Sequence, residues 1–168
     1  MNYSILPMLQ HHWQAVRQIY SEGIATRNAT FETELPEWDK WDSAHREDCR
    51  LIAAEGGLDS PNVLGWAALS AVSARRVYAG VAEVSVYVAA QARGRGVGKS
   101  LLNALVDESE QHGVWTLQAG IFPENVASIA LHKSCEFRQV GRHDRIAKLV
   151  DQWRDVLLFE RRSRRVGL

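Results

Sequence analysis

The segment Glu83-Val-Ser-Val-Tyr-Val-Ala-Ala-Gln-Ala-Arg-Gly-Arg-Gly-Val-Gly-Lys-Ser-Leu-Leu102 decides the fold of this 168-residue chain. Valines alternate with other residues over 84–88, as is typical of a strand. Three glycines follow at 94, 96 and 98, and a helical pattern then begins. Glycine lets a backbone approach a ligand closely, and a helix N-terminus offers free N–H groups and a positive dipole end. The segment therefore predicts a strand, a phosphate-binding loop and a helix in succession.

Two well-known phosphate loops each fail at one obligatory glycine. The dinucleotide pattern G-x-G-x-x-G needs glycine at position 99 or 101, where the chain has Lys99 and Leu101. The triphosphate loop G-x-x-x-x-G-K-[ST] fits residues 98–100, but its first glycine falls on Arg93. Neither a dinucleotide nor a nucleoside triphosphate is therefore the predicted ligand.

The pattern R-x-x-G-x-G does fit, at Arg93, Gly96 and Gly98. It resembles the pyrophosphate loop of the GCN5-related N-acetyltransferases, which bind acetyl-coenzyme A (acetyl-CoA). Taken alone, the loop also fits an ordinary glycine-rich turn between a strand and a helix.

Further strands and helices interleave along the chain. Strands are expected over 3–6, 51–54, 63–69, 82–88, 115–121, 137–146 and 153–160, and helices over 11–21, 37–47, 97–111 and 125–134. Gly23 is a plausible stop for the first helix, and the Gly-Gly and Ser-Pro-Asn steps within 55–62 predict a turn. The helix over 97–111 carries an apolar stripe at Leu101, Leu102, Leu105 and Val106. This order predicts an α/β sandwich around a mixed sheet.

Composition narrows the functional classes. Lys plus Arg and Asp plus Glu are each 20, and this zero net charge argues against a nucleic-acid partner. No apolar run reaches 18 residues and the start has no signal-peptide layout, so a cytoplasmic protein without a membrane partner is expected. The two cysteines and the histidines lack metal-ligand spacing, so no metal is expected. We expect one domain over 1–168, with a solvated basic tail over about 161–168.

Four further motifs resemble the phosphinothricin acetyltransferase group of this superfamily, and together they cover nearly the whole chain. They are Thr30-Phe-Glu-Thr-Glu-Leu-Pro36, Ala82-Glu-Val-Ser-Val-Tyr-Val88, Asn125-Val-Ala-Ser128 followed by Leu131-His132, and Trp153-Arg-Asp155. The resemblance implies a mixed, mostly antiparallel sheet that is splayed at the acetyl-CoA site. One departure is Glu136-Phe137, where the family usually has Gly-Phe, and it puts the helix C-cap in doubt.

The resemblance also implies how acetyl-CoA binds. The pantetheine arm would pair with the strand backbone, a backbone N–H near Val86 would stabilise the oxyanion, and the loop amides would hold the pyrophosphate. The implied contacts are Val86, Tyr87, Val88, Arg93, Gly94, Arg95, Gly96, Val97, Gly98, Lys99, Asn125 and Ser134. The alternative interpretation of Asn125 is a helix N-cap, and both can be true.

Two residues are the candidate catalytic groups. Acyl transfer needs a neutral amine, and Glu83, at the position of the family's acid, is the candidate base, directly or through a water. Its alternation with Ser85 and Tyr87 places these three on one face of the strand. His132 stands where much of the superfamily has a tyrosine thought to protonate the leaving thiolate. The residues leave open whether His132 is that acid or only lines the site.

The group's acceptors are glutamate analogues, which carry an α-amine and an acidic or polar head. Arginine suits such oxyanions, and the loop over 71–78 contains Arg75 and Tyr78 in the family's Ala-Arg-x-x-Tyr arrangement. The implied acceptor contacts are Phe31, Ser73, Arg75, Tyr78, Glu83, Val84 and Ser85.

Taken together, the resemblance implies an N-acetyltransferase for phosphinothricin, methionine sulfoximine or sulfone, or arsinothricin, with a role in detoxification or resistance. Members of the group are often homodimers, so a homodimer is expected. Two alternatives stay open. One is acetylation of another amine, such as a polyamine or a protein N-terminus, and the other is a non-catalytic CoA-binding module.

Overall fold

The computed structural model describes residues 2–56 and 62–168, so the predicted turn over 55–62 lies mostly outside the described residues. Its sheet has the order β1-β2-β3-β4-β5-β7-β6, and β4–β5 is the one parallel pair of the described ladders. The strands are β1 (Ser4–Pro7), β2 (Arg50–Glu55), β3 (Asn62–Ala71), β4 (Val81–Val88), β5 (Thr116–Ile121), β6 (Arg138–Leu149) and β7 (Gln152–Arg162). The prediction of a mixed, mostly antiparallel sheet is confirmed.

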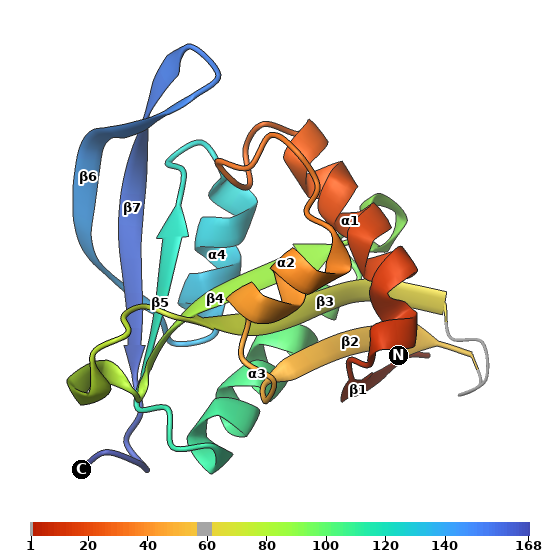
Figure 1. Ribbon diagram of the computed structural model, residues 1–168, viewed down its shortest axis with the longest axis horizontal. Coiled ribbons are helices and arrows are strands. Elements are labelled where there is room, and N and C mark those ends of the chain that lie inside the picture. The colour runs from red at the N-terminus through yellow and green to blue at the C-terminus, as the bar shows by residue number, and fades with distance from the viewer. Residues whose placement is uncertain (1, 57–61) are drawn as a thin grey trace.

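Helices cover both faces of the sheet (Figure 1). They are α1 (Trp13–Ala25), α2 (Trp38–Ala44), α3 (Val97–Gln111) and α4 (Val126–Ser134), with short 3₁₀ turns η1 (Gln10–His12), η2 (Arg76–Tyr78) and η3 (Ala90–Ala92). On the α1/α2 face, Trp66 of β3 packs edge-on against Tyr20 and Trp41. On the other face, the predicted α3 stripe is buried, and Leu101, Leu102 and Leu105 are fully inaccessible to solvent. Burial of such side chains is the main stabilising term of the sandwich.

The sheet opens between β4 and β5. The described ladder between them runs only from Val81–Thr116 to Glu83–Gln118, although β4 stays paired with β3 as far as Val88. Beyond Glu83, the edge of β4 that faces β5 therefore has no strand partner among the described residues. Unpaired backbone groups of this kind need another hydrogen-bond partner. The splay that the resemblance implied is present.

Most of the predicted elements have slightly different ends in the structure, and the larger differences have physical reasons. Helix α1 passes through Gly23 instead of ending there, because Gly23 is a packing position: a Cβ would lie 2.6 Å from Cδ1 of Tyr87. Helix α2 stops at Ala44, three residues early, where His45 is extended and its carbonyl accepts a bond from Arg50. The hairpin β6–β7 is longer than predicted, and its two strands are separated by only two residues.

The expectation of a solvated tail beginning at 161 is wrong for its first residues. Strand β7 continues to Arg162, and Ser163 is buried. The cause is Glu110, a buried carboxylate near the end of α3, which accepts hydrogen bonds from Arg161, Ser163 and Arg165. These partners hold the pKa of Glu110 below its usual value despite its burial. A buried carboxylate needs such partners, and here the basic run supplies them.

Candidate active site

A cavity of about 990 Å³ lies where β4 and β5 part. Every residue of β4 from Glu83 to Val88 lines it, and because successive side chains alternate sides, the cavity reaches both faces of the sheet. The predicted site residues that line it are Phe31, Glu83, Val84, Ser85, Val86, Tyr87, Val88, Arg93, Gly94, Gly96, Val97, Gly98, Lys99, Asn125 and His132. The fold thus brings the glycine loop and the acid-bearing strand to one space.

The glycine loop is shaped to leave room for a ligand. Gly94 and Gly96 have φ of +74° and +80°, in the left-handed region that side-chain-bearing residues rarely adopt. Among the residues that the structure describes, a Cβ on Gly94 would meet nothing within 4 Å, and one on Gly96 would meet only the Tyr3 hydroxyl at 3.8 Å. Gly96 is also the N-cap of the 15-residue helix α3, whose first amides and positive dipole end favour an anion. The loop therefore fits a phosphate group bound through the backbone.

Glu83 stands at the point where the strands separate, opposite Gln118 in the last described β4–β5 pair. Glu83 is an exposed residue that lines the open cavity, and the protein around the cavity still removes part of the water near its carboxyl. This desolvation raises the pKa of the Glu83 carboxyl above its usual value. A raised pKa lies closer to neutral pH, and a general base is most effective when its pKa is near the pH at which the enzyme works.

His132 on α4 lies on the opposite side of the sheet from Glu83. It is only 3% exposed, and its Nδ1 is 2.8 Å from the Ser128 carbonyl oxygen, which fixes Nδ1–H as the donor. The other nitrogen, Nε2, is buried and has no hydrogen-bond partner among the described residues. Burial lowers the pKa of His132, although the bond to Ser128 acts in the opposite direction. The neutral ring therefore presents Nε2 as an acceptor.

Comparison with known proteins agrees with this geometry. Residues 13–137 match the family described as Acetyltransferase (GNAT) family. The chain is 32% identical over 162 residues to a phosphinothricin N-acetyltransferase of Streptomyces coelicolor, and this match covers 94% of each protein. The chain belongs to the GNAT acetyltransferase family. It is also 27% identical over 146 residues, 84% of each protein, to an L-methionine sulfoximine/L-methionine sulfone acetyltransferase of Pseudomonas aeruginosa.

A solved structure supports the fold of this acetyltransferase. The structure of yncA from Salmonella typhimurium with its cofactor acetyl-CoA superposes with a TM-score of 0.86 at 26% identity and covers 96% of this chain and 94% of that one. Within residues 2–56 and 62–168, no helix is long and apolar enough to span a membrane.

The acetyltransferase has an aromatic wall that the sequence did not reveal. Tyr87 stacks on Trp66, with ring centroids 4.8 Å apart, and packs edge-on against Tyr20 at 4.9 Å. Both tyrosines line the cavity together with Thr30, and burial raises the pKa of each. The face that Tyr87 occupies is the one predicted from its alternation with Glu83. Tyr20 was not foreseen, because on α1 it reads as one of several apolar core residues.

Asn125 is a helix N-cap, as one of its two interpretations predicted, and its side chain also lies at the cavity. Its Oδ1 accepts from the Ser128 amide at 3.2 Å, which makes it the N-cap of α4, and it also lines the cavity. In addition, its Nδ2 donates to the Asn28 carbonyl at 3.0 Å. This last contact ties α4 to the segment that follows α1.

Five predicted site residues lie outside the described lining of the cavity. The Arg95 guanidinium pairs with Glu55, and the Ser134 hydroxyl donates to the Leu131 carbonyl on its own helix. The other three are on the β3–β4 loop, where the Arg75 guanidinium lies over the Tyr78 ring at 5.6 Å and the Arg75 amide donates to the Ser73 hydroxyl. The fold therefore places this loop beside the start of β4 and not inside the cavity.

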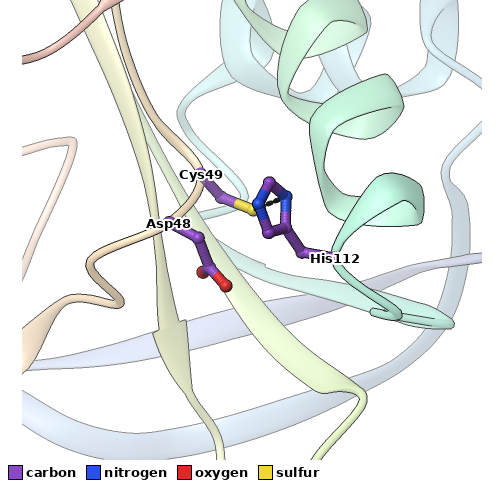
Figure 2. Close-up of side chains that lie close together, drawn as sticks. All are labelled: Asp48, Cys49 and His112. Carbon is purple, nitrogen blue, oxygen red and sulfur yellow. Dashed lines mark hydrogen bonds between the residues drawn. The ribbon is translucent and has the colours of Figure 1, made fainter.

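A second cluster of titratable side chains, Asp48, Cys49 and His112, lies away from the cavity (Figure 2). The Cys49 sulfur is 3.9 Å from Nδ1 of His112. Both Asp48 oxygens already accept from Arg46, and the same Nδ1 is 2.9 Å from the Glu108 carbonyl, to which it donates. Burial is the main cause that raises the pKa of the Cys49 thiol to about 12. Contacts within the protein explain this cluster, and the expectation of no metal stays a prediction.

Proposed function

We propose that this enzyme transfers the acetyl group of acetyl-CoA to the α-amine of a small acidic amino-acid analogue, such as phosphinothricin or methionine sulfoximine or sulfone. The observation that carries the proposal is the single cavity that joins the glycine loop to Glu83 through the splayed sheet. The names of the two relatives support the class of acceptor.

In the proposed reaction, the pyrophosphate binds the loop amides, and the pantetheine arm pairs with the free edge of β4. The neutral amine attacks the thioester carbon, and an N–H near Val86 stabilises the developing oxyanion. Glu83 takes the proton of the amine, directly or through one water. The new C–N bond forms, the C–S bond breaks, and CoA leaves as the thiolate.

We assign His132 a role in lining the site and not the role of proton donor to the thiolate. Its Nδ1–H is engaged by Ser128, and its lowered pKa keeps the ring neutral, so Nε2 has no proton to give. A thiol has an ordinary pKa of about 8.5, so a thiolate leaves near neutral pH without obligatory protonation. Of the two roles that the sequence left open, the lining role is thus the better supported.

Arg75 is a proposed selector of acidic acceptors on the sequence resemblance alone, since its exposed guanidinium lies over the Tyr78 ring and outside the described lining of the cavity. A hydrogen bond to a charged group contributes about 1.5–3 kcal/mol, so Arg75→Ala should lower kcat/KM for acceptors with an oxyanion head by roughly 10–200-fold. Neutral amines should lose little, and Arg75→Lys should recover only part of the loss, because an ammonium lacks the bidentate fork. Arg76→Ala is the matched control, with near-wild-type kinetics expected. Equal losses for acidic and neutral acceptors would make Arg75 a structural residue.

A panel of amines assayed by release of the CoA thiol tests the proposed function. Turnover should be highest with phosphinothricin, methionine sulfoximine or methionine sulfone. A preference for spermidine or for a peptide N-terminus would support the alternative acetyltransferase, and acetyl-CoA binding with no turnover on any amine would support a binding module. Acetylation of arsinothricin, a homodimeric assembly and a cytoplasmic location stay predictions from the sequence resemblance.

A further inference from the structure

The acceptor side of the cavity has one wall without regular secondary structure. After α1, the chain over 26–32 forms only turns and bends, and Asn28, Thr30, Phe31 and Glu32 of this segment line the cavity. Such a segment has no backbone ladder to hold it in place. Its position must therefore come from contacts with other elements.

Arg154 on β7 supplies several of these contacts. Its Nη1 donates to the Arg27 carbonyl at 2.9 Å, and its Nη2 is 3.4 Å from the Asn28 Oδ1. The same Nη2 donates to the Glu124 carboxylate at 3.0 Å, and the guanidinium carbon lies 4.1 Å from the Phe122 ring centroid. The side chain is only 14% exposed, whereas its partner Glu124 is 64% exposed. The guanidinium is thus largely buried, and these contacts fix its orientation toward the 26–32 segment.

The turn between β5 and α4 completes the same support. Asn125 donates to the Asn28 carbonyl, and the Phe122 ring meets the Phe31 ring edge-on at 4.9 Å. Arg154 therefore joins three parts of the chain: strand β7, the β5–α4 turn and the segment over 26–32. A planar guanidinium with several donors and an aromatic-stacking face can make these contacts at once, which an ammonium cannot.

We propose that Arg154 is a positioning residue for the acceptor, which holds the segment over 26–32 so that Phe31 and its neighbours form the wall of the acceptor site. The proposal rests on the proposed function for the identity of the acceptor. Arg154 itself contacts neither the glycine loop nor Glu83 among the described contacts. Its loss should therefore weaken acceptor binding equally in the ground and transition states, which raises KM without changing kcat.

The kinetic test compares Arg154→Leu with Arg142→Leu, using methionine sulfone as acceptor. Arg142 is a matched control on the same hairpin, because its partners are Asp144 and Asp155 and not the 26–32 segment. Arg154→Leu should raise the KM for methionine sulfone by roughly 10–100-fold, the range for loss of charged hydrogen bonds, while kcat and the acetyl-CoA KM stay unchanged. An unchanged acceptor KM, or an equal rise in both KM values, would overturn the proposal.

Hydrogen exchange tests, without any acceptor, whether Arg154 holds the segment over 26–32. In the substrate-free protein, Arg154→Leu should speed amide exchange over 26–32 at least about tenfold, with β2 and β3 unchanged, because local opening becomes easier. Unchanged exchange over 26–32 would overturn the proposal. If the wild-type enzyme acetylates no analogue, the proposed function fails, and the exchange result still decides on Arg154. Arg154→Lys, which keeps a cation on β7, should give an intermediate exchange rate and replaces the leucine variant if that variant does not fold.

Discussion

Replacement of Glu83 by glutamine should lower kcat/KM for the amine acceptor by about 10²–10⁴-fold, the usual cost of removing a general base. Glutamine keeps the size of the side chain but cannot accept the proton of the amine. The affinity for acetyl-CoA should be nearly unchanged, because Glu83 lies near the start of β4 and the glycine loop follows the other end of that strand. Steady-state kinetics and calorimetry on the same variant measure the two quantities.

The pH dependence sharpens this test. The pKa of Glu83 is raised, so kcat/KM in the wild type should fall as the pH drops through that raised value, and Glu83→Gln should lose this acidic limb. Ionisation of a carboxyl whose folded pKa is raised opposes folding. The stability that the protonated carboxyl contributes is therefore lost as the pH rises through the raised pKa. Glu83→Gln should therefore melt at the same or a higher temperature at pH 7. Wild-type turnover with an unaltered pH profile would place the proton acceptor elsewhere.

Valine at Gly96 should reduce the affinity for acetyl-CoA by at least about 100-fold, the equivalent of one or two charged hydrogen bonds. Its Cβ would project into the space that the loop keeps open for the pyrophosphate. Calorimetric titration with acetyl-CoA measures the loss. Gly113→Val is the matched control, since Gly113 also has positive φ (+72°) and no described residue within 4 Å of its Cβ, but it follows the far end of α3.

Gly98→Val should give a similar loss for a partly different reason. Its Cβ would lie 3.2 Å from Leu131 and 3.4 Å from Val88, so the packing of α3 and α4 would shift as well. Arg95→Ala should be mild, because that side chain is a screened surface cation paired with Glu55. Normal acetyl-CoA affinity in both the Gly96 and Gly98 variants would contradict the assignment of the loop.

The sequence was sufficient for features that depend on local chemistry. Alternating valines defined β4, the apolar stripe defined α3, and the three glycines located the loop between them. The sequence also predicted that Tyr87 and Glu83 share a face, since alternation along a strand follows from backbone geometry alone. Element ends were less accurate, because a contact such as Gly23 against Tyr87 overrides a local stop signal.

Contacts between distant segments were beyond the sequence. Glu110 gathers the basic run at the C-terminus, although charge alone makes that run look like a solvated tail. Arg154 reaches Arg27 and Asn28 across more than half of the chain. No periodicity or spacing encodes such pairs, because the sheet order and the helix packing bring them together only after the chain has folded.

The most direct measurement follows the acetyl group itself. The enzyme is incubated with methionine sulfone and acetyl-CoA that carries a heavy isotope at the acetyl carbonyl, and the products are identified by NMR and mass spectrometry. We predict that the label appears as an amide on the α-nitrogen of the amino acid, in step with the release of CoA, and that Glu83→Gln slows both together. Label found as free acetate, or retained on the protein, would contradict direct transfer to the amine.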